Sequence, residues 1–193
     1  MPKWPFDKFA DASRKLGTQM KATGEVMAID NSFEGALMKA VRGCEIKLDS
    51  MIAPHIQKQS DAEIKKGVAR TDDQRLFHIC EALRRGIMTI EEIHDITTMD
   101  VFFLHKFQNI IDMEKELAAA DKIDSDLYIR AKKMGFLDKT IEQLSGKDIS
   151  DVKRLPVYKM VDTCAAEFEA ETPYYYSTYD DAVSYTHLRA HET

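Results

Sequence analysis

Cysteine is scarce in this sequence. The only three, Cys44, Cys80 and Cys164, lie far apart and form no C-x-x-C pair. An odd number at such spacings argues against a disulfide framework and against a structural zinc site. We therefore expect reduced thiols in a cytoplasmic protein, with Cys164 packed in a core as a small hydrophobic residue rather than acting as a nucleophile.

Long apolar runs are also missing. No uninterrupted run approaches the roughly 18 residues that a membrane-spanning helix needs, and the first five residues contain no apolar signal core. Charge of one sign is not in large excess, because 27 basic residues stand against 33 acidic ones and give a net charge of −6. We therefore expect no membrane and no nucleic acid among the partners of this chain.

Motifs for phosphate and metal binding are absent as well. Neither G-x-x-x-x-G-K-[ST] nor G-x-G-x-x-G occurs, so no nucleotide-binding site is expected. His78-x-Cys80 and His94-Asp95 come nearest to ligand pairs, but side chains at these helical offsets do not face a common point. We predict no catalytic residue, no metal site and no cofactor within the chain itself.

The composition that remains, 44% hydrophobic and 31% charged, is that of a soluble globular protein. Residues 25–29 read as a short strand. After them, Asn31 with Glu34 forms a capping pair, and hydrophobic residues recur at three- and four-residue steps. This pattern predicts an amphipathic helix over about residues 32–49.

From residue 60 the pattern is wholly helical. Gly86 is placed to end a helix over residues 72–85, whose last turn carries the basic side chains Arg84 and Arg85, and a short helix is expected over about residues 90–96. Three capping boxes mark helix starts in this region: Ser60 with Glu63, Thr71 with Gln74, and Thr89 with Glu92.

The longest helix is expected after Asp100, which is placed to cap it. A hydrophobic stripe interrupted only by a glutamate follows, and we expect its exposed members to support self-association. The stripe consists of Val101, Leu104, Phe107, Ile110, Ile111, Glu114 and Leu117.

Two features outside the helices have more than one interpretation. Glu25 is either a functional carboxylate beside an apolar strand or merely a solvated strand end. The tyrosines at 174–176 are an aromatic, extended stretch, and its acidic surroundings oppose base stacking. Packing against a neighbouring domain is the favoured interpretation for them.

The residues themselves also carry a family resemblance. WPFDKF at 4–9 and LGTQMKATGEVMAI at 16–29 resemble the end of the first ATP-grasp domain of the carbamoyl-phosphate synthetase large subunit. ALRRG at 82–86, EEIH at 91–94 and FFL at 102–104 are similar to its oligomerisation domain. PVYKMVDTCAAEF at 156–168 is similar to the passage into its second synthetase half.

The resemblance implies a mainly α fold, with a helical oligomerisation domain flanked by partial α/β pieces of ATP-grasp type. Residues 1–50 would be the C-terminal end of the first ATP-grasp (carboxyphosphate) domain and 51–155 the oligomerisation domain. Residues 156–182 would begin the second (carbamoyl phosphate) half. Residues 183–193 are similar to a translated sequencing adapter, so we treat them as a non-native tail outside the fold.

The implied parent enzyme is a glutamine-hydrolysing ligase that makes carbamoyl phosphate from bicarbonate, glutamine-derived ammonia and two ATP, for arginine and pyrimidine biosynthesis. It would use ATP with Mg²⁺ and K⁺, work with a glutaminase small subunit and form a homo-oligomer through the helical domain. This segment would contribute connection and assembly and would be inactive alone. Asp30-Asn31, where many relatives have Gly-Arg, and a short stretch at 151–156 depart from the family pattern.

The resemblance also implies one candidate site. The M-K-x-x-G-E-V-M segment at 20–27 resembles the part of the family that lines the internal passage for carbamate, which assigns Met20 and Glu25 to its wall. Two classes of function stay open at this point: a connecting segment of a multidomain ligase, and an independent helical adaptor or scaffold module that reuses these motifs.

Overall fold

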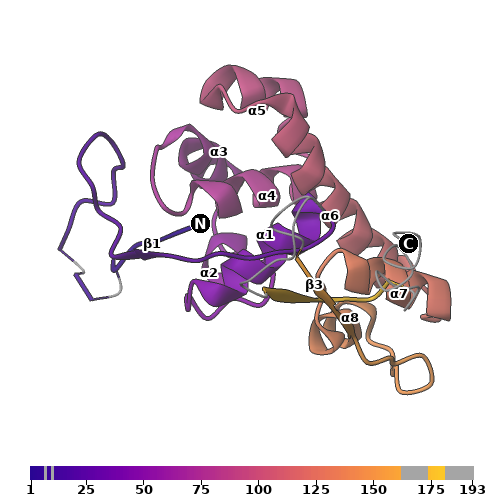
Figure 1. Ribbon diagram of the computed structural model, residues 1–193. Helices are drawn as coiled ribbons and strands as arrows, with labels where there is room; N and C mark the ends of the chain where they lie inside the picture. Colours follow the sequence, from indigo (N-terminus) through magenta and orange to yellow (C-terminus); the bar gives the residue numbers. More distant parts are fainter. Residues whose placement is uncertain (7, 10, 162–173, 181–193) are drawn as a thin grey trace.

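The computed structural model of the 193-residue chain describes residues 1–6, 8–9, 11–161 and 174–180. The prediction of a mainly α fold is confirmed (Figure 1). The expectations for Cys164, for residues 162–168 and for the 183–193 tail lie outside the described residues. Within the described residues the helices are α1 (Phe33–Gly43), α2 (Pro54–Gln57), α3 (Asp61–Ala69), α4 (Arg75–Arg85), α5 (Ile90–Thr97), α6 (Val101–Ala119), α7 (Ser125–Lys133) and α8 (Asp138–Ser145).

The strands form two small antiparallel pairs. β1 (Pro2–Lys3) pairs with β2 (Gly24–Glu25), and β3 (Val157–Met160) pairs with β4 (Tyr175–Thr178). The predicted strand over 25–29 is wrong in extent because β1 offers only two residues for pairing. The chain leaves the ladder after one more backbone hydrogen bond, from the amide of Val26 to the carbonyl of Met1 at 2.8 Å.

Helix α1 begins one residue later than the sequence indicated. Ser32, not Asn31, is its N-cap, and the Ser32 hydroxyl accepts a hydrogen bond from the amide of Gly35 at 3.0 Å. The predicted end at residue 49 is also wrong. Glu45 and Lys47 have φ angles of 58° and 59°, a left-handed backbone that a helix cannot include.

Two of the three capping boxes are confirmed. Ser60 with Glu63 opens α3, and Thr89 with Glu92 opens α5. The box at Thr71 and Gln74 is wrong, because α4 starts only at Arg75. The carbonyl of Thr71 is engaged elsewhere: it accepts a hydrogen bond from the amide of Leu16 at 2.8 Å, beside a bridge between Lys15 and Asp72.

Gly86 ends α4 as predicted, with a φ of 65° that L side chains adopt only at a cost. The following turn leads directly into α5. Asp100 caps α6, as predicted, by accepting a hydrogen bond from the amide of Phe102 at 2.8 Å. No helix in the described ranges, α6 included, combines the length and apolarity needed to cross a membrane.

The core is built around α6. Six of the seven stripe residues are buried, so Val101 is the one exposed member to which the expectation of self-association applies, and that expectation stays a prediction. The core also takes in residues of α1, such as Met38 and Val41. The 50/51 domain boundary stays a prediction.

Glu114, the residue that interrupts the stripe, is buried on the inner face of α6. Arg84 of α4 pairs with it through two hydrogen bonds, of 2.7 Å from Nε and 3.2 Å from Nη2. Arg84 also pairs with Glu81, which in turn accepts from Arg85 at 2.8 Å. Burial raises the pKa of the Glu114 carboxyl, and the Arg84 guanidinium opposes that shift.

We expect Glu114→Ala to destabilise the chain by about 3–5 kcal/mol, because it leaves the Arg84 guanidinium buried without its main partner. Replacing the pair together, with Arg84→Met and Glu114→Leu, should recover most of that loss because no charge is then stranded. Urea unfolding followed by circular dichroism measures both variants. A single variant within about 0.5 kcal/mol of the unaltered chain, the range of ordinary surface substitutions, would contradict the role given to this pair.

Candidate functional site

The two residues assigned to a carbamate passage lie on the surface of this chain. Met20 is in the loop before β2 and is 85% exposed. Glu25 is the second residue of β2, opposite Pro2, and is also exposed. Neither residue lines the cavity described below or the pocket beside Cys44. Their assignment therefore depends on the resemblance.

The histidines singled out in the sequence have partners within the fold. Nδ1 of His78 lies 3.0 Å from the carbonyl of Gln74, and Nε2 lies 3.1 Å from the side-chain oxygen of Gln59. Burial lowers the pKa of His78. Nδ1 of His94 lies 2.7 Å from the carbonyl of Met99. Among the described residues no group of three or more His, Cys, Asp or Glu side chains is arranged to hold a metal ion.

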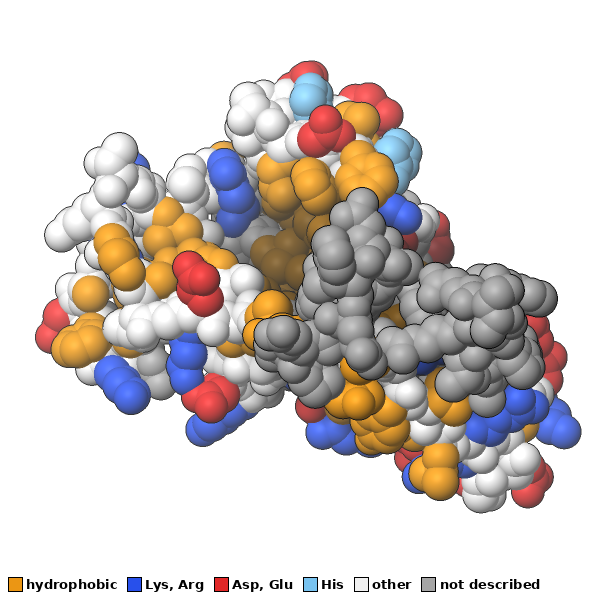
Figure 2. Space-filling view, in the orientation of Figure 1, with side chains coloured by type: hydrophobic (Ala, Val, Ile, Leu, Met, Phe, Trp, Pro, Cys, Tyr) orange, Lys and Arg blue, Asp and Glu red, His pale blue; other side chains and the backbone are white. Residues whose placement is uncertain are grey.

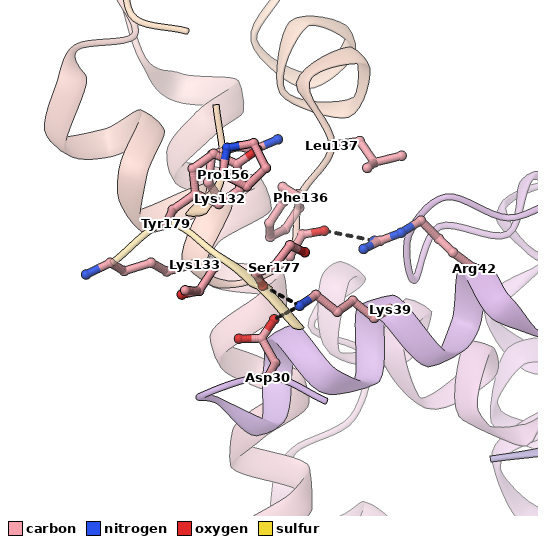
Figure 3. Close-up of a pocket in the computed structure, with 12 residues that line it drawn as sticks. Asp30, Lys39, Arg42, Lys132, Lys133, Phe136, Leu137, Pro156, Ser177 and Tyr179 are labelled. Carbon is pink, nitrogen blue, oxygen red and sulfur yellow. Dashed lines mark hydrogen bonds and ion pairs between the residues drawn. The ribbon is translucent and has the colours of Figure 1, made fainter. Parts of the chain in front are cut away.

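A cavity of about 110 Å³ lies where three parts of the chain meet (Figure 3). The first part supplies Asp30 and the inner side of α1, the second supplies the turn between α7 and α8, and the third supplies β4 with Pro156. Its described lining consists of Asp30, Lys39, Arg42, Lys132, Lys133, Gly135, Phe136, Leu137, Pro156, Ser177, Thr178 and Tyr179.

Lys39 joins two of these parts. Its ammonium group lies 2.8 Å from a carboxylate oxygen of Asp30 and donates to the carbonyl of Ile29 at 3.1 Å. It also donates to the carbonyl of Ser177 at 2.7 Å, and Figure 3 shows it reaching between the first part and β4. All three protons of the ammonium group thus have an acceptor, which fixes β4 against α1.

Asp180 gathers side chains from all three parts. Lys133 lies 3.1 Å from it and Lys159 lies 3.2 Å from it. The side-chain amide of Asn31 donates to the same carboxylate, and Asn31 accepts from the hydroxyl of Tyr176 at 2.8 Å. Burial acts to raise the pKa of Asp180, but the hydrogen bonds from Lys133, Lys159 and Thr178 lower it. Asn31, expected to cap α1, is used for this contact instead.

The turn between α7 and α8 packs closely on α1. Gly135 has a φ of 87°, and a Cβ there would lie 2.9 Å from the Cβ of Met38 and 3.2 Å from the Cα of Gly35. The carbonyl of Gly135 accepts a hydrogen bond from Arg42 at 2.8 Å. Burial lowers the pKa of Arg42. Gly135 therefore allows the turn to approach the backbone of α1, whereas a Cβ at Gly35 would lie 2.7 Å from the side chain of Asp30.

This arrangement is suited to holding chain segments together rather than to catalysis. The charges around the cavity are mostly paired with one another, as Lys132 is with Asp138 at 2.6 Å. Sequence reasoning did not single out Lys39 or Arg42. One usable signal was Gly35, because a glycine inside a helix often marks a close packing contact, here with the side chain of Asp30.

We expect Gly135→Ala to destabilise the chain by about 2–4 kcal/mol, because it combines left-handed backbone strain with a clash against α1. Gly146→Ala is the matched control. Gly146 also has a positive φ, 65°, but nothing lies within 4 Å of the Cβ that would be added. Thermal unfolding should show a loss of only about 1 kcal/mol for the control, and equal losses in both variants would refute the close contact.

Comparison with known proteins gives the family. Residues 25–159 match the family described as carbamoyl-phosphate synthetase large chain, oligomerisation domain. The chain is 50% identical over 188 residues to the carbamoyl phosphate synthase large chain of Lachnoclostridium phytofermentans, which covers 93% of this chain. The corresponding large chains of a Thermoanaerobacter species and of Clostridium acetobutylicum are 48% and 47% identical, each over 94% of this chain.

The chain spans only 17–18% of the length of these relatives. The match to the family covers every helix of the described residues, from α1 to α8. The relatives extend the similarity into both flanking hairpins, which supports the resemblance noted at 4–29 and 156–168. This chain therefore belongs to the carbamoyl-phosphate synthetase large-chain family and contains its oligomerisation domain.

Proposed function

We propose that this chain is the connecting and oligomerisation segment of a longer, glutamine-hydrolysing carbamoyl-phosphate synthase. The observation that carries the proposal is the 50% identity to a carbamoyl phosphate synthase large chain over 93% of this chain. An independent helical adaptor is disfavoured because an adaptor that reused the helices alone would not need to keep the family sequence in both flanks. The parent would make carbamoyl phosphate from bicarbonate, glutamine-derived ammonia and two ATP.

The parent's other properties belong to the same proposal. It would bind ATP with Mg²⁺ and K⁺ outside this segment, take ammonia from a glutaminase small subunit, and serve arginine and pyrimidine biosynthesis in the cytoplasm. It would form homo-oligomers through the helical domain, in keeping with the description of the matched family. The contacts of Lys39 and Arg42, which we call the junction around α1, would hold the two synthetase halves in a fixed relation to the helices, because they join all three parts of the chain.

The 193-residue chain alone should neither hydrolyse ATP nor make carbamoyl phosphate, because it has no phosphate-binding motif. The measurement is bicarbonate-dependent ATPase activity in protein freed of the host's own synthetase. The full-length parent, assayed alongside, is the positive control. Activity of the isolated chain above a buffer blank would refute its role as a connecting segment only.

Met20 and Glu25 would line the passage that carbamate takes between the two ATP sites. Both side chains are exposed here, so both are available to face the rest of the parent. Carbamate is an anion that decomposes in water, and a carboxylate in the wall would favour its neutral, protonated form while methionine supplies an adaptable apolar surface.

In the full-length parent, Glu25→Ala or Met20→Trp should lower carbamoyl-phosphate formation severalfold while bicarbonate-dependent ATP hydrolysis persists. The two half-reactions would be uncoupled because carbamate is lost or blocked on its way. Thr23→Ala and Gln19→Trp, at exposed neighbours, are matched controls that should leave the coupling unchanged. Equal loss of both activities would indicate a folding defect, and unchanged coupling would remove these residues from the passage.

A further inference from the structure

The helical part of the chain has one apolar surface patch. Large exposed hydrophobic side chains in the flanking segments are scattered, but between residues 51 and 154 all those described lie at the corner where α5 meets α6. They are Ile96 (46% exposed), Val101 (42%), Phe102 (53%) and Phe103 (41%). Figure 2 shows hydrophobic side chains gathered at this corner, near the top of the view. We refer to these four residues as the corner patch.

The corner patch is continuous with the first residue of α1. The ring of Phe33 lies 5.3 Å from that of Phe103 and 6.4 Å from that of Phe102, in tilted and edge-to-face arrangements. Phe102 and Phe103 are themselves 5.3 Å apart, edge to face. Such contacts hold the rings in place before any partner arrives, which lowers the entropy lost on docking.

The rim of the corner patch is acidic. Four exposed carboxylates lie on α5 or at the N-cap of α6, the two elements that carry the patch, and within the described residues none of them forms an ion pair with a lysine or arginine: Glu91, Glu92, Asp95 and Asp100. The nearest lysine in sequence, Lys106, lies 3.3 Å from Glu34 and 5.4 Å from the centre of the Phe102 ring. An apolar centre with a negative rim fits a partner surface with an apolar centre and a positive rim.

A second copy of the same corner has an apolar centre but does not offer a positive rim. In a twofold contact the same surface meets itself, so two acidic rims would face each other around the rings. Like charges placed opposite one another at an interface are costly. The charge pattern therefore disfavours self-association at this corner and leaves oligomer contacts to other surfaces of the helical domain.

We infer that the corner patch is the docking face for the remainder of the large chain itself, on a surface that is apolar and rimmed by lysine or arginine. This inference rests on the proposed function, since it needs the longer polypeptide. The relatives are more than five times as long as this segment, and a tethered surface meets the patch at a high effective concentration. Phe33 places the patch directly at the junction between the first part of the chain and the helices.

Hydroxyl-radical footprinting of Phe102 and Phe103 tests the inference, with the 193-residue chain compared to the full-length parent. The parent is labelled at a concentration where ultracentrifugation shows it to be monomeric. Labelling of both rings should fall roughly fivefold in the parent, because half-exposed side chains become nearly buried at the centre of an interface. Tyr158, exposed on β3, reports separately on the flanking segment.

Protection that vanishes in the monomer would assign the patch to a second copy and overturn the inference. Equal labelling in both proteins would also overturn it, whereas failure of the parent to make carbamoyl phosphate would count only against the proposed function. A variant gives an independent check: Phe102→Glu in the parent should raise Phe103 labelling severalfold without changing the oligomer distribution. Lys115→Glu reverses an exposed charge elsewhere on α6 and should change neither the labelling of Phe103 nor the oligomer distribution.

Discussion

A carboxylate on the inner face of a helix cannot be buried without a cation, and this constraint at Glu114 determines how the helices of this chain assemble. Arg84 supplies the cation from α4, and Glu81 shares it. Arg85, next in sequence, pairs with Glu81 and donates to the backbone carbonyls of Gln57 and Gln59. One connected set of charges thereby joins α6 to α4 and to the turn between α2 and α3, so α6 cannot slide or rotate without stranding a charge.

The part of the fold that the sequence could predict was local. The boxes at Ser60 and Thr89 and the stop at Gly86 depend on residues a few positions apart, and all three are confirmed. Predictions failed where a distant contact took over. Thr71 pairs with Leu16 instead of capping α4, and Asn31 contacts Asp180 instead of capping α1. Glu114 was visible as an interruption of the stripe, but its partner 30 residues away was not.

The junction around α1 was beyond sequence reasoning for the same reason. Lys39 bonds to Ser177, 138 residues later, and Arg42 bonds to Gly135, 93 residues later. No periodicity or spacing encodes such pairs. The glycines at 35 and 135 were visible, yet which group packs against each of them follows only from the tertiary packing. Asp30, one of the departures from the family pattern, is explained afterwards by its ion pair with Lys39.

The distribution of exposed hydrophobic residues follows from these two assemblies. The charge network and the Gly135 contact close the core of the helical unit, so between residues 51 and 154 its large apolar side chains are buried or partly buried except at the corner between α5 and α6. The flanks, by contrast, expose Met20, Met27 and Tyr175, because each is a short hairpin with too few residues to cover a face of its own. Segments of this kind gain stability only when they pack against larger domains. The helical unit is therefore the stable centre of the described residues, and the hydrogen bonds of Lys39 to the carbonyls of Ile29 and Ser177 hold the flanking segments against it.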